Sequence, residues 1–313
     1  MKVLRNGRGA GSIKNSVLTL GNFDGLHIGH RKVIQKVVDR ASRLACPSVV
    51  YTFDPHPLKV VSPQKSPPLI LDLEDKIRHI EELGVDFLVL ARFTRGFAER
   101  HHDEFVREAL VKKFSPVEVW VGHDFSFGKG RTGTVEHLKE LGAGFGFSTH
   151  VIPAYKKLGA VVSSSRIRGL IINGMVKEAA VLLGRGYTVK GRVVKGAQVG
   201  SLLGFPTANL TVSSEIIPGD GVYAAWATLD GKRHPAVLNI GSAPTFEGRG
   251  RCVEVHMLDF DGRIYGRRLE VSFVARLRSE AAFATPAALA AQIGKDAARA
   301  RKILKSCSGG LHC

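Results

Sequence analysis

Two histidines, His27 and His30, close a segment that reads Gly-Asn-Phe-Asp-Gly-Leu-His-Ile-Gly-His from Gly21 onward. Side chains three positions apart lie on one side of a helix, so at a helix start both imidazoles can face the same anion. Free backbone N–H groups and the positive end of the helix dipole favour a phosphate there. Gly29 leaves room for close approach. The spacing therefore indicates stabilisation of charge that develops at phosphorus.

Two other interpretations of the histidine pair stay open. The histidines can cap or pack the start of the helix, and a helical pair can contribute to a zinc site, although no nearby cysteine or clear third ligand completes one. The setting of strand, glycine-rich loop and helix favours the phosphate site.

Hydroxyl and guanidinium groups gather in residues 162–168, which read Val-Ser-Ser-Ser-Arg-Ile-Arg. Ser164, Ser165 and Arg168 there precede an apolar helical run, an arrangement suited to binding polyphosphate. Ordinary helix capping is the alternative.

Residues 121–133 combine a carboxylate, aromatic rings and basic groups. Asp124 can bind a ribose hydroxyl, and Phe125 and Phe127 can cover an aromatic ring. Either Lys129 or Arg131 can meet a phosphate. A flexible loop is the alternative.

The C-terminal half carries Gly-Phe-Pro-Thr-Ala-Asn-Leu from Gly204. The Thr207 hydroxyl and the Asn209 amide oxygen are oxygen ligands of the kind that Mg²⁺ takes. A capped turn is the alternative. Glu254 follows in a strand-like segment, where an exposed structural glutamate is the alternative to a chemical role.

The elements that must position these residues alternate in the first half of the chain, which predicts a parallel α/β sheet. The expected strands are 17–20, 48–53, 86–90 and 118–121, and the expected helices are 29–44, 73–83 and 103–113. Ligand sites of such sheets lie at the carboxyl ends of strands. The loops that begin at Gly21, Asp54 and Gly122 therefore share one predicted edge.

After about residue 184 the pattern changes to short strands with frequent turns, which predicts a compact antiparallel barrel. The expected strands are 187–195, 221–229, 236–240, 252–260 and 268–275. A helix over 286–304 closes the chain, followed by a frayed tail over 306–313.

The motifs resemble those of the bacterial bifunctional riboflavin kinase/FAD synthetases, in the family's order and over about residues 2–301. The segment ending at His30 resembles the H-x-G-H signature of nucleotidyltransferases. Residues 162–168 are similar to the second signature, I-S-S-T-x-I-R, with Ser165 where Thr is common. Residues 53–57 and 121–133 resemble segments lining the flavin and nucleotide pocket, and 204–210 resembles the P-T-A-N motif of riboflavin kinases.

This resemblance implies an α/β chain with a Rossmann-like nucleotidyltransferase domain over 1–184, a β-barrel riboflavin-kinase-like domain with a C-terminal helix over 185–305, and a flexible tail over 306–313. It implies transfer of AMP from ATP to FMN, giving FAD and pyrophosphate, and phosphorylation of riboflavin by ATP, giving FMN. ATP, FMN and riboflavin are then the substrates and Mg²⁺ the cofactor.

The resemblance also implies roles for particular residues. For adenylyl transfer these are His27, His30 and Arg168 in catalysis, Gly21, Asn22, Phe23, Asp24, Gly29, Asp124, Ser164 and Ser165 at the nucleotide, and Phe53, Pro57, Phe125, Phe127 and Arg131 at the flavin. For the kinase step they are Glu254 as base toward the riboflavin 5′-hydroxyl, Gly204, Thr207 and Asn209 at ATP, and Thr207 and Asn209 at the metal.

The loop over 195–203 departs from the family, because no Arg or Lys follows Lys195 before Thr207. Backbone N–H groups can still bind phosphate, but charge-assisted contacts are lost. An FAD synthetase with a degenerate kinase domain is therefore the alternative. A nucleotidyltransferase acting on a pantetheine or nicotinate nucleotide is a second one, against which the second domain argues.

The net charge of +17 favours anionic partners, and both nucleic acid and small phosphorylated ligands fit that description. Basic residues are spread along the chain, so we expect small-molecule substrates and no specific nucleic acid. A basic nucleic-acid-binding protein on this scaffold is the alternative. The oligomeric state stays open.

No apolar run approaches the roughly 18 to 20 residues that cross a bilayer, and the N-terminus lacks the apolar stretch of a secretory signal. We therefore expect a cytoplasmic protein without a membrane partner. The four cysteines show no C-x-x-C spacing, which favours free thiols, and a bridge between Cys307 and Cys313 is the alternative.

Overall fold

The computed structural model describes residues 1–6, 9, 11, 13–196, 200, 203–241 and 251–307 of the 313-residue chain. Contacts divide the chain into two compact units, Met1–Ser163 and Ser164–Cys313. Each unit is described by itself. The domain boundary expected after residue 184 falls about twenty residues later in the sequence than the start of the second unit, and it stays a prediction.

The first unit contains a six-stranded sheet in the order β1-β4-β3-β2-β5-β6, with every neighbouring pair parallel. Its strands are β1 (Lys2–Arg5), β2 (Val17–Leu20), β3 (Ser48–Phe53), β4 (Phe87–Ala91), β5 (Glu118–Gly122) and β6 (Ser148–Ile152), beside a small ribbon of β7 (Lys156–Lys157) and β8 (Ala160–Val161). The α/β prediction for this half is confirmed.

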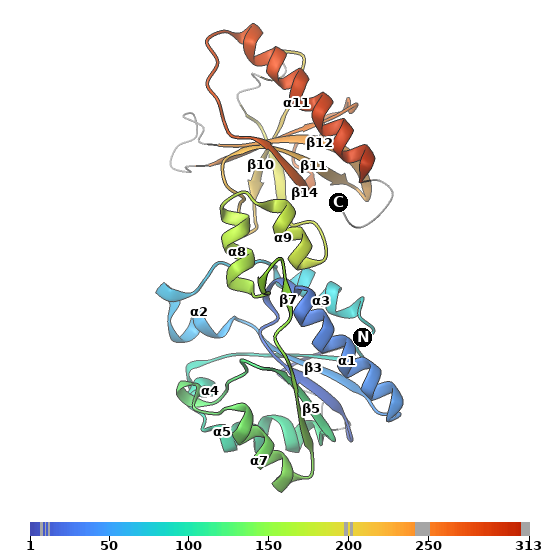
Figure 1. The fold of residues 1–313 in the computed structure, drawn as a ribbon, viewed down its shortest axis with the longest axis vertical. Coiled ribbons are helices and arrows are strands. Elements are labelled where there is room, and N and C mark those ends of the chain that lie inside the picture. Colours follow the sequence, from blue (N-terminus) through green and yellow to red (C-terminus); the bar gives the residue numbers. More distant parts are fainter. Residues whose placement is uncertain are drawn as a thin grey trace. The chain divides into compact units, whose positions relative to one another are not determined.

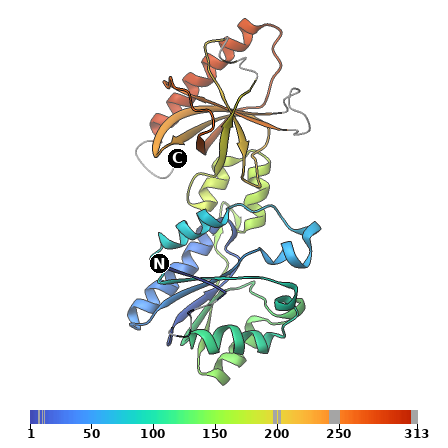
Figure 2. The same cartoon turned by 180° about the vertical axis from the view of Figure 1, so that it is seen from behind.

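Helices cover both faces of this sheet (Figures 1 and 2). They are α1 (Ile28–Arg43), α2 (Pro57–Val61), α3 (Leu73–Glu81), α4 (Arg95–Ala98), α5 (His102–Phe105), α6 (Lys112–Phe114) and α7 (Val135–Phe145). On one face Val50 and Leu88 pack with Ile34 of α1 and Ile80 of α3. Residues that alternate with them along the strands face the other layer, where α5, α6 and α7 supply buried side chains. Burial on both faces explains why the strands are almost continuously apolar.

The structure differs from the sequence prediction in several details of this unit. The single helix expected over 103–113 consists of α5, a π-helical segment over Val106–Val111, and α6. The strands β1 and β6 and the helix α7 were not among the expected elements. The strand β1 pairs with β4 at the edge of the sheet, and of its four residues only Leu4 is buried, so its sequence carries little of the strand pattern.

The second unit begins with α8 (Ser164–Ile172) and α9 (Val176–Leu183) and continues as a closed barrel in the order β10-β13-β12-β11-β14-β9. Its strands are β9 (Thr188–Val194), β10 (Ala208–Val212), β11 (Gly221–Leu229), β12 (Lys232–Gly241), β13 (Cys252–Met257) and β14 (Arg268–Arg278). All neighbouring pairs are antiparallel. The barrel prediction is confirmed, and β10 is the strand that sequence patterning missed.

The C-terminal helix α11 (Pro286–Ser306) lies along the barrel (Figure 1). Ala297, Ala300 and Leu304 of α11 pack against Val222 and Leu277 of the barrel. Thr285 caps the helix, accepting a hydrogen bond from Ala288 N at 3.1 Å. Residues 308–313 of the expected tail lie outside the described part of the chain.

The cysteines are only partly as expected. Cys46 and Cys252 are free thiols, which agrees with the prediction. Cys307 is disulfide-bonded, so the free-thiol prediction is wrong there. Cys313 lies outside the described residues.

Candidate active sites

The loops expected at one edge of the sheet do lie there, because β3, β2 and β5 are adjacent and parallel. From β2 the chain adds β3 and β4 on one side, and then β5 and β6 on the other. The strand order therefore reverses at β2. In open α/β sheets ligands bind outside the carboxyl ends of strands at such a reversal. The loops after Leu20 and Gly122 flank this position.

His27 and His30 form a stacked pair at the start of α1. Their ring centroids are 3.6 Å apart and the planes differ by 15°. His27 caps the helix, since its Nδ1 accepts a hydrogen bond from His30 N at 3.2 Å. A Cβ at Gly29 would lie 3.2 Å from the His27 ring, so glycine makes room for the stack. Both expected features, capping and convergence of the imidazoles, are present together.

The His30 imidazole is kept neutral by its surroundings. Burial lowers its pKa well below the ordinary value, and the charges of His27 and Lys76 lower it further. The Phe23 ring meets it edge-on, with centroids 5.4 Å apart. Its Nδ1 is buried and has no hydrogen-bond partner among the described residues. A neutral imidazole can donate one hydrogen bond to an anion, as a dipole rather than as a full positive charge.

The loop before the histidines has an unusual backbone. Phe23 and Leu26 take left-handed conformations, with φ of 47° and 39°. Such conformations each cost on the order of 1–3 kcal/mol in non-glycine residues and need support from the surrounding structure. Asp24 supplies it: its carboxylate, 2% exposed, accepts hydrogen bonds from Ile70 N at 3.0 Å and Leu71 N at 3.4 Å. The expected contact of Asp24 with nucleotide stays a prediction.

Lys76 of α3 supports the same loop and was not found by sequence reasoning. Its side chain is 6% exposed, and Nζ donates a hydrogen bond to Asn22 O at 2.9 Å. The Thr52 hydroxyl donates to the same oxygen at 3.3 Å. Burial lowers the pKa of Lys76, and the Asp24 and Asp54 carboxylates oppose that shift.

A signal for Lys76 was present in the sequence. It stands three residues after Leu73 and four before Ile80, which places it on the apolar stripe of an amphipathic helix. A lysine at such a position is buried only with a partner.

The expected flavin segment at Phe53 lies beside the same edge. Phe53 is half-buried, and its ring meets Phe93 and Phe97 with centroid distances of 5.4 and 5.9 Å. Pro57 begins α2, which His56 caps by accepting a hydrogen bond from Leu58 N at 3.2 Å. These contacts position the segment, and its role toward flavin stays a prediction.

The loop after β5 divides into exposed and buried parts. The Asp124 side chain is 84% exposed, whereas Phe127 is 7% exposed and packs in the core against Phe105. Phe125 stacks on Phe127 with centroids 5.5 Å apart. The Arg131 guanidinium donates from Nε to Ser126 Oγ at 2.7 Å. Phe127 is thus a core residue, and the ligand contacts expected of these side chains stay predictions.

In the second unit, Ser164 begins α8. Arg168 donates from Nη1 to Ser165 Oγ at 3.4 Å, so a guanidinium and a hydroxyl one turn apart are brought together. The contact is local to α8, and the expected role toward polyphosphate stays a prediction.

Three polar residues line up across neighbouring strands of the barrel. Glu254 of β13 stands opposite Asn209 of β10 on one side and opposite Asn239 of β12 on the other. Side chains of directly opposed residues lie on the same face of a sheet. Val253 and Val255 alternate with Glu254 and are buried in the barrel, so the polar row occupies the outer face.

Glu254 lies in a partly desolvated and acidic environment. Burial raises its pKa, and the nearby Glu280 carboxylate raises it further. Asn239 Nδ2 donates to Glu280 Oε1 at 3.5 Å, which links that carboxylate to the row. A base with a raised pKa is better matched to proton abstraction near neutral pH. Sequence reasoning assigned a role to Glu254 and none to Asn239 or Glu280, which the strand register and the Asn239–Glu280 contact place beside it.

Asn209 and its neighbours form the other end of the row. Asn209 is 5% exposed, and its Oδ1 accepts a hydrogen bond from Cys252 Sγ at 3.0 Å. Thr207 directly precedes β10, and Gly204 has a φ of 81°, which L side chains rarely adopt. In the altered loop over 195–203, residues 197–199, 201 and 202 lie outside the described residues.

None of the helices in the described part of the chain is both long and apolar enough to cross a bilayer.

Comparison with known proteins matches both halves of the chain. A family model described as FAD synthetase matches residues 10–166, and one described as riboflavin kinase matches residues 183–304. The bifunctional riboflavin kinase/FMN adenylyltransferase of Escherichia coli strain K12 is 37% identical over 91% of this chain and 92% of its own. The Haemophilus influenzae protein of the same name is 34% identical over 94% of this chain and 96% of its own.

A solved structure has the same fold over nearly its whole length. It is described as a macrolide-efflux protein from Streptococcus pneumoniae, with a TM-score of 0.87 and 30% sequence identity. The match covers 96% of this chain and 99% of that protein.

Proposed function

The chain belongs to the family of bifunctional riboflavin kinase/FMN adenylyltransferases, and we propose that its two reactions use two sites, the carboxyl edge of the parallel sheet and the outer face of the barrel. It phosphorylates riboflavin to FMN, and it transfers AMP from ATP to FMN, giving FAD and pyrophosphate. ATP, riboflavin and FMN are its substrates. The assignment of residues to the two steps is developed below.

For adenylyl transfer, the supporting observation is the stacked His27–His30 pair where the strand order reverses. The FMN phosphate attacks the α-phosphorus of ATP in line and displaces pyrophosphate, with no covalent intermediate on the enzyme. The α-phosphate lies at the N-terminus of α1, where backbone N–H groups and the helix dipole favour it. His30 donates a hydrogen bond to an oxygen whose negative charge grows in the transition state.

The other residues expected to act in adenylyl transfer bind and orient the substrates. Ser164, Ser165 and Arg168 hold the polyphosphate, because hydroxyls and a guanidinium give charge-assisted hydrogen bonds to phosphate oxygens. Asp124 binds the ribose. Phe53, Pro57 and Phe125 contact the flavin ring. Positioning of this kind supplies a large share of the rate for phosphoryl chemistry.

The His30→Ala variant tests the adenylyl-transfer site. FAD formation from FMN and Mg-ATP should fall about a hundredfold or more, as for loss of one transition-state donor. FMN formation from riboflavin by the same preparation is the internal control and should be unchanged. An unmutated rate of FAD formation would remove His30 from the mechanism.

For the kinase step, the supporting observation is the row of Asn209, Glu254 and Asn239 with the raised pKa of Glu254. Glu254 takes the proton from the riboflavin 5′-hydroxyl, and the alkoxide oxygen attacks the γ-phosphorus of ATP, with ADP leaving. Asn209, at one end of this row, and Thr207, which precedes its strand, bind the phosphates of ATP.

Oxygen donors of Thr207 and Asn209 fit Mg²⁺, a hard cation that prefers hydroxyl, carbonyl and carboxylate ligands. Asn209 Oδ1 accepts one hydrogen bond from Cys252 and keeps a second lone pair. When bound, Mg²⁺ neutralises charge on the transferred and leaving phosphates.

The protein acts in the cytoplasm on small molecules and has no specific nucleic-acid partner. What supports this is the dispersed distribution of basic residues and the small phosphorylated substrates that a charge of +17 already attracts. Retention of RNA by the purified protein that survives moderate salt would contradict it, since non-specific contacts to phosphates weaken steeply with salt.

A further inference from the structure

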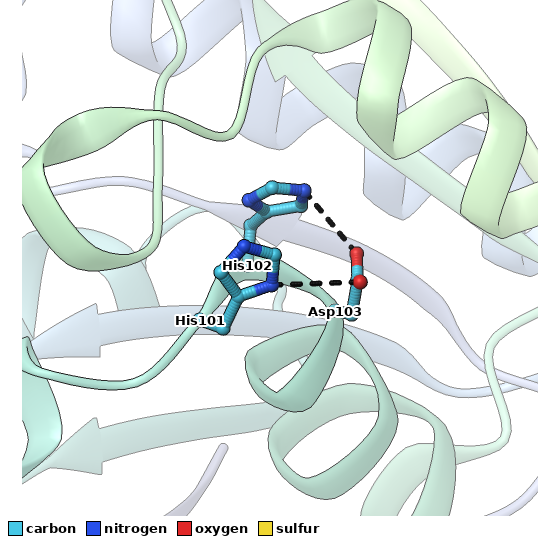
Figure 3. A group of neighbouring side chains, drawn as sticks. All are labelled: His101, His102 and Asp103. Atoms are coloured by element: carbon cyan, nitrogen blue, oxygen red, sulfur yellow. Dashed lines mark ion pairs between the residues drawn. The ribbon is translucent and has the colours of Figure 1, made fainter.

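Two imidazoles and a carboxylate converge outside the sites described above, where α5 begins (Figure 3). Asp103 Oδ2 lies 3.4 Å from His101 Nδ1, and Asp103 Oδ1 lies 3.2 Å from His102 Nε2. One ligand atom from each of the three side chains falls within 4.8 Å of the others. Nothing in adenylyl transfer or riboflavin phosphorylation uses this cluster.

Convergence of three consecutive residues needs a reason, because successive side chains on a helix point about 100° apart. His101 supplies it by lying before the first helical residue, with φ of −62° and ψ of 152°. This extended residue turns its ring back toward the helix start. Its ring centroid is 4.0 Å from that of His102.

The distances match those between ligands of one small cation. In a tetrahedral site with bonds of roughly 2.0–2.1 Å, ligand atoms are about 3.3–3.4 Å apart. The two imidazole-to-carboxylate distances, 3.2 and 3.4 Å, are close to this value, and they end on the two different oxygens of Asp103. One ligand atom from each side chain lies within 4.8 Å of the others, so an ion binds once these atoms close to about 3.4 Å.

The His102 ring is oriented by contacts on the side away from Asp103, as rings of metal-binding histidines usually are. Its ring stacks on that of His137 at 4.8 Å, and its Nδ1 is 3.5 Å from Thr132 Oγ1. The Thr132 hydroxyl in turn donates to Lys129 O at 3.0 Å. When His102 Nδ1 donates to the Thr132 hydroxyl, Nε2 is the nitrogen that faces the Asp103 carboxylate and can ligate an ion.

Close packing fixes the backbone of His102 as well. A Cβ at Gly128 or at Gly133 would lie 2.8 or 2.7 Å from His102 Cβ, so only glycine fits at either position. The His102 side chain is 14% exposed, whereas those of His101 and Asp103 are 62% and 52% exposed. The cluster thus has one fixed ligand and two accessible ones.

We propose that His101, His102 and Asp103 form a binding site for one transition-metal dication, with water completing the coordination. Imidazole nitrogen suits Zn²⁺, Ni²⁺ and Cu²⁺, whereas Mg²⁺ prefers all-oxygen ligands. The site is therefore separate in chemistry from the Mg²⁺ of the two reactions. It lies against the loop that carries Phe127 and Arg131, which a bound ion would restrain through His102.

Calorimetric titration of the full-length protein, without a histidine tag and without nucleotide, with Zn²⁺ tests the proposal. The unmutated protein should bind one equivalent that His101→Asn and Asp103→Asn each weaken about tenfold or more. These two positions are exposed, so both variants should fold. His102→Asn should weaken binding at least as much.

The matched control is His79→Asn. His79 Nδ1 also faces a carboxylate, Glu82 Oε2 at 2.9 Å, but within the described part of the chain that pair belongs to no three-ligand group. This variant should bind Zn²⁺ like the unmutated protein. Equal affinity in the unmutated protein and the cluster variants, or no Zn²⁺ binding with the metal in large excess, would show an ion-pair cluster only and overturn the proposal.

Discussion

The two reaction sites hold their polar groups in different ways. At the edge of the sheet, one continuous segment from Gly21 to His30 carries the chemical groups, and buried partners from α3 and the 70–71 segment hold its left-handed backbone. On the barrel, Asn209, Glu254 and Asn239 come from three strands and are aligned by register alone. The first site therefore depends on support from beneath a loop, and the second on strand pairing that the whole barrel maintains.

The largest effect that would test this contrast is expected at Glu254. Glu254→Gln keeps the size and the register of the side chain but removes the base. Riboflavin phosphorylation should fall roughly 10²- to 10⁴-fold, the usual contribution of a general base. FAD formation from added FMN should not change. Loss of both activities together would mean that the two sites are not independent.

A smaller effect is expected from the lysine beneath the sheet-edge loop. Lys76→Met fills the same space but donates nothing to Asn22 O. FAD formation should fall roughly ten- to a hundredfold through misplacement of the loop, while FMN formation is unchanged. Arg78→Met on the exposed face of the same helix is the matched control. If Lys76→Met made FAD at the rate of that control, the loop would not need its buried support.

Gly29→Ala separates activity from helix stability. Alanine in place of glycine favours the helix by up to about 1 kcal/mol. Its Cβ would press on the His27 ring at 3.2 Å and tilt the stacked pair. We expect roughly a tenfold loss of FAD formation without a fall in thermal unfolding temperature. A parallel loss of stability would point to general damage instead.

The smallest effect is expected from Glu280→Gln, seen in a pH profile. Burial and the Glu280 charge both raise the pKa of Glu254, and a base is lost as pH falls through its pKa. Removing the like charge lowers that pKa, so the acid limb of the kinase profile should move to lower pH. The rate on the plateau should stay nearly the same. An unmoved limb would show that Glu280 does not act on the base.

These differences explain how far the sequence could predict each site. The loop from Gly21 to His30 is contiguous, so strand, loop, helix and both histidines could be inferred from spacing. Lys76 lies 46 residues after His30, and only packing shows which loop it meets. On the barrel, Glu254 and Asn209 were found through motifs, but the position of Asn239 beside them follows from register, which local sequence patterns leave unspecified.

Phe127 marks a different kind of gap. As an aromatic residue in a polar loop it was expected to cover a ligand ring, yet its side chain is 7% exposed and packs against Phe105. Aromatic residues serve a core and a ligand surface equally well. Composition alone therefore could not separate Phe127 from Phe125, which is only half-buried.

The histidine caps of α1 and α2 determine where two protons lie. His27 and His56 each accept a backbone N–H at Nδ1, so in the neutral ring the hydrogen must be on Nε2. Each neutral ring is thereby fixed as a single tautomer with Nε2 as its donor. The caps that start two helices at the carboxyl edge of the sheet therefore also decide which nitrogen of each histidine is its donor.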